Sequence, residues 1–348
     1  MTSAPQPLDA HGERGWLPGV SVIMSVLDEE DHLADAVQCI LDQDYTGSLE
    51  VVIALGPSRD RTDRVATELM GRDERVRTVP NPSGRTPAGL NAALAAARFD
   101  IIVRVDGHAL VPVDYVRVAV DTLARTGADN VGGVMAAEGV TPFERAVARA
   151  MTSVIGVGAA SFHVGGEEGP ARTVYLGAFR RGALDRVGGY DEEFERAQDW
   201  EMNHRIRDTG GLVWFTPRMT VSYRPRSSVQ RLARQYYGYG RWRREIMREH
   251  PETVSLRYLA APIAVAGVTI GTVAALAGRA GLAGQAGEPW LRLGVVAPVG
   301  YTALILAASL VTGRGLPPAS LVRLPLVYAT MHGSWGVGFL ASPRDLRA

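Results

Sequence analysis

The stretch FDIIVRVDGH, residues 99–108, decides the fold, because an apolar strand from Phe99 to Val105 ends in Asp106-Gly107-His108. Three similar apolar runs precede it, and helical patterns separate them. The runs are Val20–Val26, Glu50–Leu55 and Val76–Val79, and the helical patterns are Glu30–Leu41, Asp60–Met70 and Thr86–Ala97. Apolar strands joined by helices are typical of a parallel sheet with helices on both faces. The sequence therefore predicts an α/β fold, Rossmann-like and mostly parallel.

Polar residues follow each of these strands directly. Asp28-Glu29-Glu30 follows the first strand, Ser58-Arg59-Asp60 the second and Ser83-Gly84-Arg85 the third. In such sheets the ligand lies at the carboxyl ends of the strands, so we expect a site where these segments meet. Each segment also has a purely structural interpretation, because acids cap helices and polar residues form turns.

Asp106 and His108 are the strongest candidates for metal ligands. A carboxylate and an imidazole two residues apart lie on the same side of an extended chain, where both can face one divalent cation. The alternative is an Asp-Gly turn without a ligand. The residues alone leave both interpretations open.

Asp199 is a candidate of a different kind. The segment Gln198-Asp199-Trp200-Glu201 opens an amphipathic helix that stops at Gly210-Gly211. An acid in the first turn of a helix is favoured in its ionised form by the helix dipole. From the residues alone, Asp199 is therefore either a functional carboxylate or an acid that stabilises the start of the helix.

The last quarter of the chain has a different composition from the rest. The 91 residues from Tyr258 to Ala348 contain eight charged residues, whereas the whole chain is 21% charged. Three windows lack Asp, Glu and Arg: Tyr258–Gly278, Leu293–Gly313 and Leu324–Pro343. Since about 20 apolar residues cross a bilayer as a helix, we predict a domain of about three transmembrane helices, the third spanning or re-entrant. The alternative is a buried helical hairpin of a soluble protein.

The segment before this tail is strongly basic. Arg224 to Arg248 contains eight arginines and one acid, Glu245, with tyrosines and a tryptophan between them. Basic residues beside a span favour the cytoplasmic side, and interleaved aromatic residues favour a helix at the membrane surface. The first 19 residues are polar and do not resemble a signal peptide. We therefore expect a multi-pass cell-membrane protein with a cytoplasmic catalytic domain; a solvated charged helix is the alternative for the basic segment.

Composition excludes several classes of site. Cys39 is the single cysteine, which excludes a disulfide framework and a multi-cysteine metal site. All basic residues other than histidine are arginine, which excludes a Schiff-base or P-loop lysine. Outside the basic segment, the first 257 residues contain 23 arginines and 34 acids, so nucleic acid is not expected as a partner.

Taken together, these motifs resemble the inverting family 2 glycosyltransferases with the GT-A fold. The resemblance is greatest to the membrane-associated branch exemplified by succinoglycan-biosynthesis glucosyltransferases, and it covers roughly Gly19 to Pro251. The motifs that carry it are Val103–Ala109, Val187–Glu192 with Gln198-Asp199, and Arg234-Gln235-Tyr236 with Tyr239–Trp242. Together with the composition of the tail, it predicts a flexible N-terminus (1–19), a cytoplasmic catalytic domain (20–223), a basic interfacial segment (224–257), a transmembrane domain (258–343) and a C-terminal tail (344–348).

The resemblance also implies roles for individual residues. Asp106 and His108 occupy the ligand positions of the family's DxD motif for Mg²⁺ or Mn²⁺, and Asp199 that of the general base. By position, donor contacts are expected from Asp28, Glu29, Arg85 and Asp106, and acceptor or closure contacts from Gln198, Gln235, Arg241 and Trp242. Two departures are Ser25–Glu29, where the family has Pro-x-aromatic-Asn-Glu, and Leu55, where it has an acid that holds the nucleotide base.

The expected activity is metal-dependent, inverting transfer of one sugar at a time from a nucleotide-diphosphate donor, a UDP-sugar. The expected acceptor is a lipid-linked or cell-surface glycan at the cytoplasmic membrane face. One alternative is transfer to a polyprenyl phosphate. From another class, the alternative is a non-catalytic membrane scaffold or transporter subunit with a degenerate glycosyltransferase domain, which would have no use for Asp106, His108 and Asp199.

Overall fold

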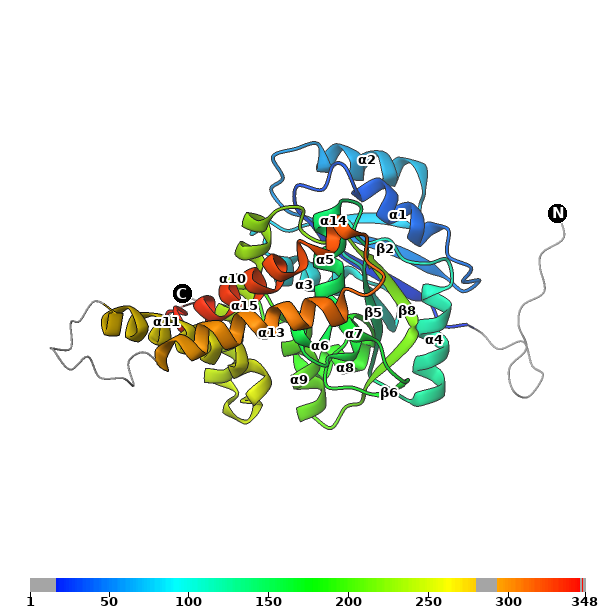
Figure 1. The fold of residues 1–348 in the computed structure, drawn as a ribbon. Coiled ribbons are helices and arrows are strands. Elements are labelled where there is room, and N and C mark those ends of the chain that lie inside the picture. Colours follow the sequence, from blue (N-terminus) through cyan, green and yellow to red (C-terminus); the bar gives the residue numbers. More distant parts are fainter. Residues whose placement is uncertain (1–16, 280–292, 345, 347–348) are drawn as a thin grey trace. The chain divides into compact units, whose positions relative to one another are not determined.

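The computed structural model describes residues 17–279, 293–344 and 346 (Figure 1). The chain forms two compact units. The first comprises Met1–Ala136 and Gly165–Tyr223, and the second comprises Ala137–Val164 and Arg224–Ala348. The predictions for residues 1–16 and for most of the C-terminal tail lie outside the described residues.

The first unit is built on an eight-stranded sheet with the strand order β3-β2-β1-β4-β7-β5-β8-β6. Its strands are β1 (Val20–Val26), β2 (Leu49–Leu55), β3 (Val76–Pro80), β4 (Ile101–Arg104), β5 (Asn130–Ala137), β6 (Gly169–Pro170), β7 (Tyr175–Arg180) and β8 (Val213–Tyr223). β1 pairs in parallel with both β2 and β4, and β2 pairs in parallel with β3. This half of the sheet confirms the predicted α/β pattern.

The other half of the sheet is antiparallel. β7 lies between β4 and β5 and runs antiparallel to both, and β6 runs antiparallel to β8. The sheet is therefore mixed, which the alternation of the first four strands did not indicate. Because β7 opposes β4, its first residues lie beside the carboxyl end of β4, where the candidate ligands follow.

Helices cover both faces of this sheet, and alternate strand residues point into the two layers. In β1, Val22 and Met24 pack with α1, α2 and α4, whereas Ile23 packs with α3, α8 and α9. The helices are α1 (Leu33–Leu41), α2 (Thr62–Arg72), α3 (Thr86–Ala96), α4 (Tyr115–Thr126), α8 (Arg181–Val187) and α9 (Gln198–Asp208). Cys39, on α1, packs at the margin of this core, as a structural cysteine would.

The second unit is helical. It contains α5 (Pro142–Met151), α6 (Val154–Val157), α7 (Ser161–Val164), α10 (Val229–Glu249), η1 (Pro251–Thr253), α11 (Leu256–Arg279), η2 (Leu293–Val295), α13 (Val296–Thr312), α14 (Pro318–Leu321) and α15 (Leu324–Leu340). Two stretches of described helix, Leu256–Arg279 and Leu293–Thr312, are long and apolar enough to cross a membrane. These are the first two of the three predicted windows.

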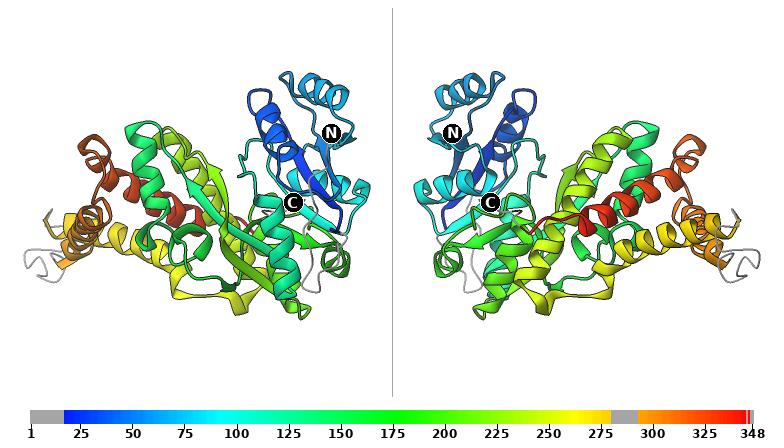
Figure 2. Two further views of the ribbon diagram at one scale, coloured as in Figure 1. Left: turned by 90° about the vertical axis from the view of Figure 1, so that its right-hand side faces the viewer. Right: turned by 90° about the vertical axis from the view of Figure 1, so that its left-hand side faces the viewer.

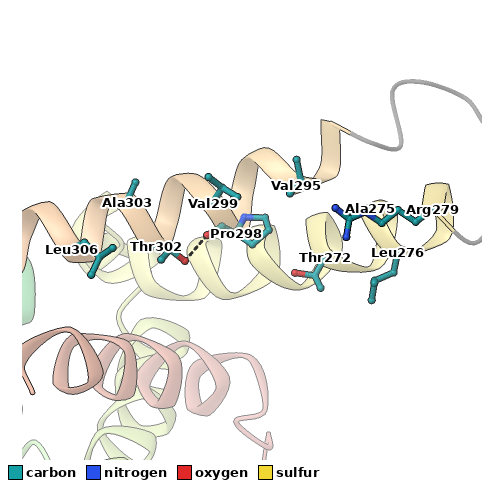
Figure 3. A pocket seen from close by; sticks show the side chains of 10 residues that line it. All are labelled: Thr272, Ala275, Leu276, Arg279, Val295, Pro298, Val299, Thr302, Ala303 and Leu306. Atoms are coloured by element: carbon teal, nitrogen blue, oxygen red, sulfur yellow. Dashed lines mark hydrogen bonds between the residues drawn. The ribbon is translucent and has the colours of Figure 1, made fainter.

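α11 and α13 lie side by side in both views of Figure 2. A groove with a volume of about 520 Å³ runs between them, and Figure 3 shows the side chains that line it. They are Thr272, Ala275, Leu276, Arg279, Val295, Pro298, Val299, Thr302, Ala303 and Leu306. Leu276 and Val299 are more than half exposed, which suits helices whose surroundings are hydrocarbon and not water.

The third window folds differently from the other two. α15 has 17 residues, fewer than the roughly 20 that a full crossing needs. It packs along α10, and Val327, Tyr328 and Met331 are fully buried within the unit. A lack of charged residues cannot distinguish a helix buried in protein from one facing lipid. For this reason, the sequence predicted the same transmembrane role for all three windows.

The arginines of α10 have partners inside the second unit. Arg244 donates to the carbonyls of Phe339 and Leu340, and Arg248 donates to that of Ser342 at 2.8 Å, so both cap the end of α15. The guanidinium of Arg243 lies 3.9 Å from the ring centre of Tyr258. Several of the eight arginines thus stabilise the helical unit itself, and a role at the membrane surface stays a prediction for the others.

Candidate active site

The site begins with a charged residue at the end of an apolar strand. Arg104 is the last residue of β4 and is 5% exposed. Its Nη1 lies 2.5 Å from Oδ1 of Asp199, and its Nη2 and Nε lie 3.0 and 3.2 Å from Oδ1 of Asp106. One guanidinium therefore joins the two carboxylates that the sequence singled out, although they are 93 positions apart.

Asp199 lies in the first turn of α9, and two unusual backbone positions support it. Ala197, directly before the helix, has φ +63°, and Leu176 at the start of β7 has φ +58°. The N–H of Leu176 donates to Oδ2 of Asp199 in a long hydrogen bond of 3.4 Å. Left-handed backbone is costly for residues with a Cβ, so local strain accompanies the contact between Leu176 and the carboxylate and the start of α9 at Ala197.

Burial raises the pKa of the Asp199 carboxyl above its ordinary value. Arg104 opposes this effect, and Asp106 adds to it. The expectation from the start of the helix considered the helix dipole alone, whereas the loss of water acts in the opposite direction and the pKa of this carboxyl is raised. Burial likewise raises the pKa values of Tyr115 and Tyr190, which lie near the two carboxylates.

Asp106 and His108 lie in a turn and not in an extended strand. The N–H of Ala109 donates to the carbonyl of Asp106 at 2.9 Å, which closes the turn. At its centre, a Cβ on Gly107 would come within 2.8 Å of the Val26 side chain, so the turn approaches β1 closely because this residue is a glycine. The prediction of an extended chain here is wrong, and the two candidate ligands have separate partners.

His108 contacts an acid on the neighbouring loop. Its Nδ1 lies 2.7 Å from Oε1 of Glu29, which follows β1. Asp28, the preceding residue, has φ +57°, and its Oδ1 accepts from the N–H of Arg59 at 2.7 Å. Glu29 therefore faces the candidate metal site, whereas the carboxylate of Asp28 joins the loop after β1 to the loop after β2.

Arg85 and Gln198 both contact the segment that leads into α9. Nε of Arg85 lies 3.4 Å from Oε1 of Glu195, and the side-chain amide of Gln198 donates to the carbonyl of Glu195 at 2.5 Å. Arg85 is at the start of α3, after the third strand, as the sequence indicated. Arg85, Glu195 and Gln198 thus connect a strand-end loop to the helix that carries Asp199.

The three remaining candidates belong to α10 of the second unit. The side-chain amide of Gln235 donates to the hydroxyl of Tyr239 at 2.8 Å. The guanidinium of Arg241 lies 5.9 Å from the ring centre of Tyr237. Trp242 is largely buried, with 7% of its surface exposed.

Sequence reasoning overlooked Arg104 as a member of the site. The signal was present, because a charge stands in the apolar run Ile101-Ile102-Val103-Arg104-Val105. Isolated charges are almost never buried in a sheet without a partner. An arginine at the end of a buried strand therefore indicates acids close by, and here they are Asp106 and Asp199.

Comparison with known proteins is consistent with this geometry. A family model described as glycosyl transferase family 2 matches residues 21–188. Succinoglycan biosynthesis protein ExoA of Rhizobium meliloti (strain 1021) is 30% identical over 331 residues, which cover 94% of this chain and 95% of the relative.

Two further proteins are more distant. Dolichyl N-acetyl-alpha-D-glucosaminyl phosphate 3-beta-D-2,3-diacetamido-2,3-dideoxy-beta-D-glucuronosyltransferase of Methanococcus voltae is 24% identical over 237 residues, which cover 64% of this chain and 71% of that protein. The structure of mannosyltransferase PcManGT from Pyrobaculum calidifontis, in complex with GDP-Man and Mn²⁺, has a TM-score of 0.60 at 19% identity. That likeness covers 98% of this chain and 91% of the mannosyltransferase, and it shows that the two proteins share a fold.

Proposed function

This chain belongs to glycosyltransferase family 2, and from that premise we propose that it is a metal-dependent, inverting transferase that uses a nucleotide-diphosphate sugar. The observation that carries the proposal is the position of Asp199. Its carboxylate lies at the carboxyl edge of the sheet, partly buried and bound to Arg104, on the same guanidinium as Asp106. The carboxyl edge is where α/β sheets bind their ligands.

In this proposal Asp199 is the general base. Its side chain is 23% exposed, so it is accessible to an acceptor while burial raises its pKa, and a base with a raised pKa takes protons more readily. It would accept the proton of the acceptor hydroxyl as the oxygen attacks the anomeric carbon from the side opposite the leaving diphosphate. Attack from that side inverts the configuration of the sugar.

Asp106 and His108 would hold a divalent cation, and their surroundings suit this role. Both contacts from Arg104 go to Oδ1 of Asp106, and Oδ2 accepts no hydrogen bond from the part of the chain that the structure describes. The contact of His108 Nδ1 with Glu29 directs Nε2 away from that acid, in the arrangement common for metal-binding histidines. A bound Mg²⁺ or Mn²⁺ would neutralise charge on the leaving diphosphate. The mannosyltransferase of the same fold was solved with GDP-Man and Mn²⁺, which supports this assignment.

We propose that donor contacts come from the loops after β1 and β3. Arg85 forms an exposed ion pair with Glu195, and such pairs are weak. Its guanidinium could therefore leave Glu195 and bind a phosphate of the donor. Glu29 is positioned beside His108, whereas Asp28 contributes by holding the loop. A UDP-sugar remains the proposed donor.

The proposed acceptor is a lipid-linked or cell-surface glycan at the cytoplasmic face of the cell membrane. Two apolar helices suit attachment to a bilayer, and one relative is named as acting on a dolichyl-linked sugar phosphate. Gln198, Gln235, Arg241 and Trp242 are the proposed acceptor and closure residues. Since Trp242 is largely buried, we expect it to support α10 rather than to contact the sugar itself.

The test is transfer of radiolabelled sugar from UDP- and GDP-sugars to membrane lipid extracts, by purified wild type and Asp199→Asn in detergent. Because the amide cannot take a proton, we expect kcat to fall about 10²- to 10⁴-fold with donor affinity retained. The control is Asp208→Asn, which makes the same change at an exposed position on the same helix. Near-normal turnover of a folded Asp199→Asn protein would remove Asp199 from the mechanism. Label appearing only on polyprenyl phosphate would replace the glycan acceptor with that lipid.

A further inference from the structure

Arg104 binds more carboxylates than are needed to neutralise its charge. A buried guanidinium must be neutralised, and a single carboxylate would suffice for that. Arg104 instead uses different nitrogens for two carboxylates, Nη1 for Asp199 and Nη2 with Nε for Asp106. The planar fork of arginine fixes the directions of these contacts, which the rotating ammonium of lysine does not.

The surroundings of Arg104 limit its movement. Its guanidinium carbon lies 5.9 Å from the ring centre of Tyr190, which is itself 3% exposed. Arg104 is the last residue of β4, and its backbone pairs in register with that of Ile23 on β1. Because the backbone of Arg104 is held in the sheet and its side chain is confined, its guanidinium has a fixed position, and both carboxylates bind to it.

We propose that Arg104 is a positioning residue, which sets the place of Asp199 relative to Asp106 through one guanidinium. The inference rests on the proposed roles of these two acids and deepens them. Asp199 is on α9 and Asp106 follows β4, so no segment of regular structure contains both. The guanidinium links the acid proposed to receive the acceptor's proton with the acid proposed to bind on the donor side.

Arg104→Lys tests the inference, because it keeps the charge and removes the fork. A displacement of about 1 Å at a reacting group can cost roughly 10²-fold in rate, so we expect a loss of kcat of that order. We expect KM for the donor to change less than about threefold, since a cation remains beside Asp106 and the rate loss arises at the base. The matched control is Arg77→Lys on β3, where Nε and Nη2 of an arginine also bind one carboxylate, that of Glu50. That change should lower stability and leave kcat unaltered.

A double-mutant cycle separates positioning from a general effect on folding. If Arg104 acts through Asp199, adding Arg104→Lys to Asp199→Asn should change kcat less than about threefold, because the group that it positions is already lost. A purely structural role predicts the same fold-loss of kcat in both backgrounds, and that result would overturn the inference. Each purified full-length variant should show a thermal unfolding transition in detergent, so that kcat is compared only between folded proteins. If the lysine variant does not fold, Arg104→Gln carries the same cycle.

The outcomes also separate this inference from the proposed function. If Asp199→Asn alone leaves kcat near normal, the proposed base is wrong. If Asp199→Asn abolishes turnover but Arg104→Lys keeps wild-type kcat, or the cycle is additive, the base stands and the positioning role is wrong. Binding can also be measured without turnover, by titrating the Arg104→Lys protein with Mn²⁺ and a nucleoside diphosphate. Both ligands should still bind to this variant.

Discussion

Nδ1 of His108, in the turn after β4, lies 2.7 Å from Oε1 of Glu29, in the loop after β1. β1 and β4 are neighbours in the sheet, so this contact joins two adjacent loops at the carboxyl edge. A carboxylate that holds one ring nitrogen fixes the orientation of an imidazole and raises the basicity of the other nitrogen. In the proposed metal site, Glu29 would therefore orient His108 toward the cation, whether or not Glu29 itself contacts the donor.

Glu29→Gln should weaken activation by metal. Loss of the acid behind a metal-binding histidine typically costs about 10- to 100-fold in metal affinity, so the concentration of Mn²⁺ for half-maximal rate should rise by that factor. At saturating Mn²⁺, kcat should recover most of its wild-type value. Glu30→Gln in the same loop is the control, because Glu30 binds the backbone N–H of Arg61 and not His108. An equal change in both variants would mean that the effect comes from the loop and not from the histidine.

The rate should depend on pH through Asp199. Burial raises the pKa of this carboxyl above 3.8, so it holds its proton at a higher pH than an exposed aspartate does. Since only the ionised form accepts a proton, kcat should fall about tenfold per pH unit once pH drops below the raised pKa. Initial rates at saturating donor and acceptor from pH 4 to 8 measure this acid limb. The limb should persist in Asp208→Asn and vanish from the residual rate of Asp199→Asn.

Glu50 should contribute to stability in a pH-dependent way. Its side chain is buried on β2 and accepts hydrogen bonds from Ser21, Arg77 and the N–H of Arg98. Burial alone would raise its pKa, but these hydrogen bonds outweigh burial and lower the pKa below 4.5. The stabilisation is therefore complete above the unfolded-state pKa and is lost as pH falls through the lower, folded-state pKa.

Glu50→Gln should accordingly lower the free energy of unfolding by about 2 kcal/mol at neutral pH, the value of charge-assisted hydrogen bonds. The difference from wild type should shrink below about pH 4. Denaturant unfolding at both pH values, with the exposed Glu74→Gln as control, measures it. A difference that is constant with pH would show that the charge of Glu50 is not what stabilises β2.

The first four strands could be predicted because their signal is local. Val20–Val26 is an apolar run bounded by turn residues, and its predicted limits agree with β1. The antiparallel half could not be predicted in the same way. β7 contains Gly177, and β6 has two residues, so neither has a strong pattern of its own, and their pairing depends on contacts far along the chain.

The sequence singled out the candidate residues of the site but not the contacts between them, and their roles stay proposals. Asp106, His108 and Asp199 were identified because their residue types stand out at the ends of strands and helices. Arg104 connects Asp106 with Asp199 because β7 and α9 fold back beside β4. The spacing of these residues along the sequence does not predict that arrangement. The turn at Gly107 has a similar origin, since the Val26 side chain beneath it comes from another strand.

The crossing of α10 and α15 should be sensitive to single methyl groups. A Cβ on Gly338 would lie 2.1 Å from the carbonyl oxygen of Tyr237, and a Cβ on Gly240 would lie 2.1 Å from that of Trp335. Both obstacles are backbone atoms and cannot rotate away, so the two helices would have to separate. Small residues allow such close helix contacts in membrane proteins, and overpacking a tight contact costs about 1–3 kcal/mol.

Gly338→Ala should therefore lower the free energy of unfolding by at least about 1 kcal/mol, and Gly240→Ala by a similar amount. The control is Gly333→Ala in the same helix, where a Cβ meets nothing within 4 Å. Alanine is the better helix former by roughly 1 kcal/mol, so this control should be neutral or stabilising. Because both substitutions disturb one crossing, the double variant should lose less than the sum of the two single losses. Thermal or denaturant unfolding of the full chain in detergent measures all four, and equal stabilities of Gly338→Ala and Gly333→Ala would show that α10 and α15 do not cross at these glycines.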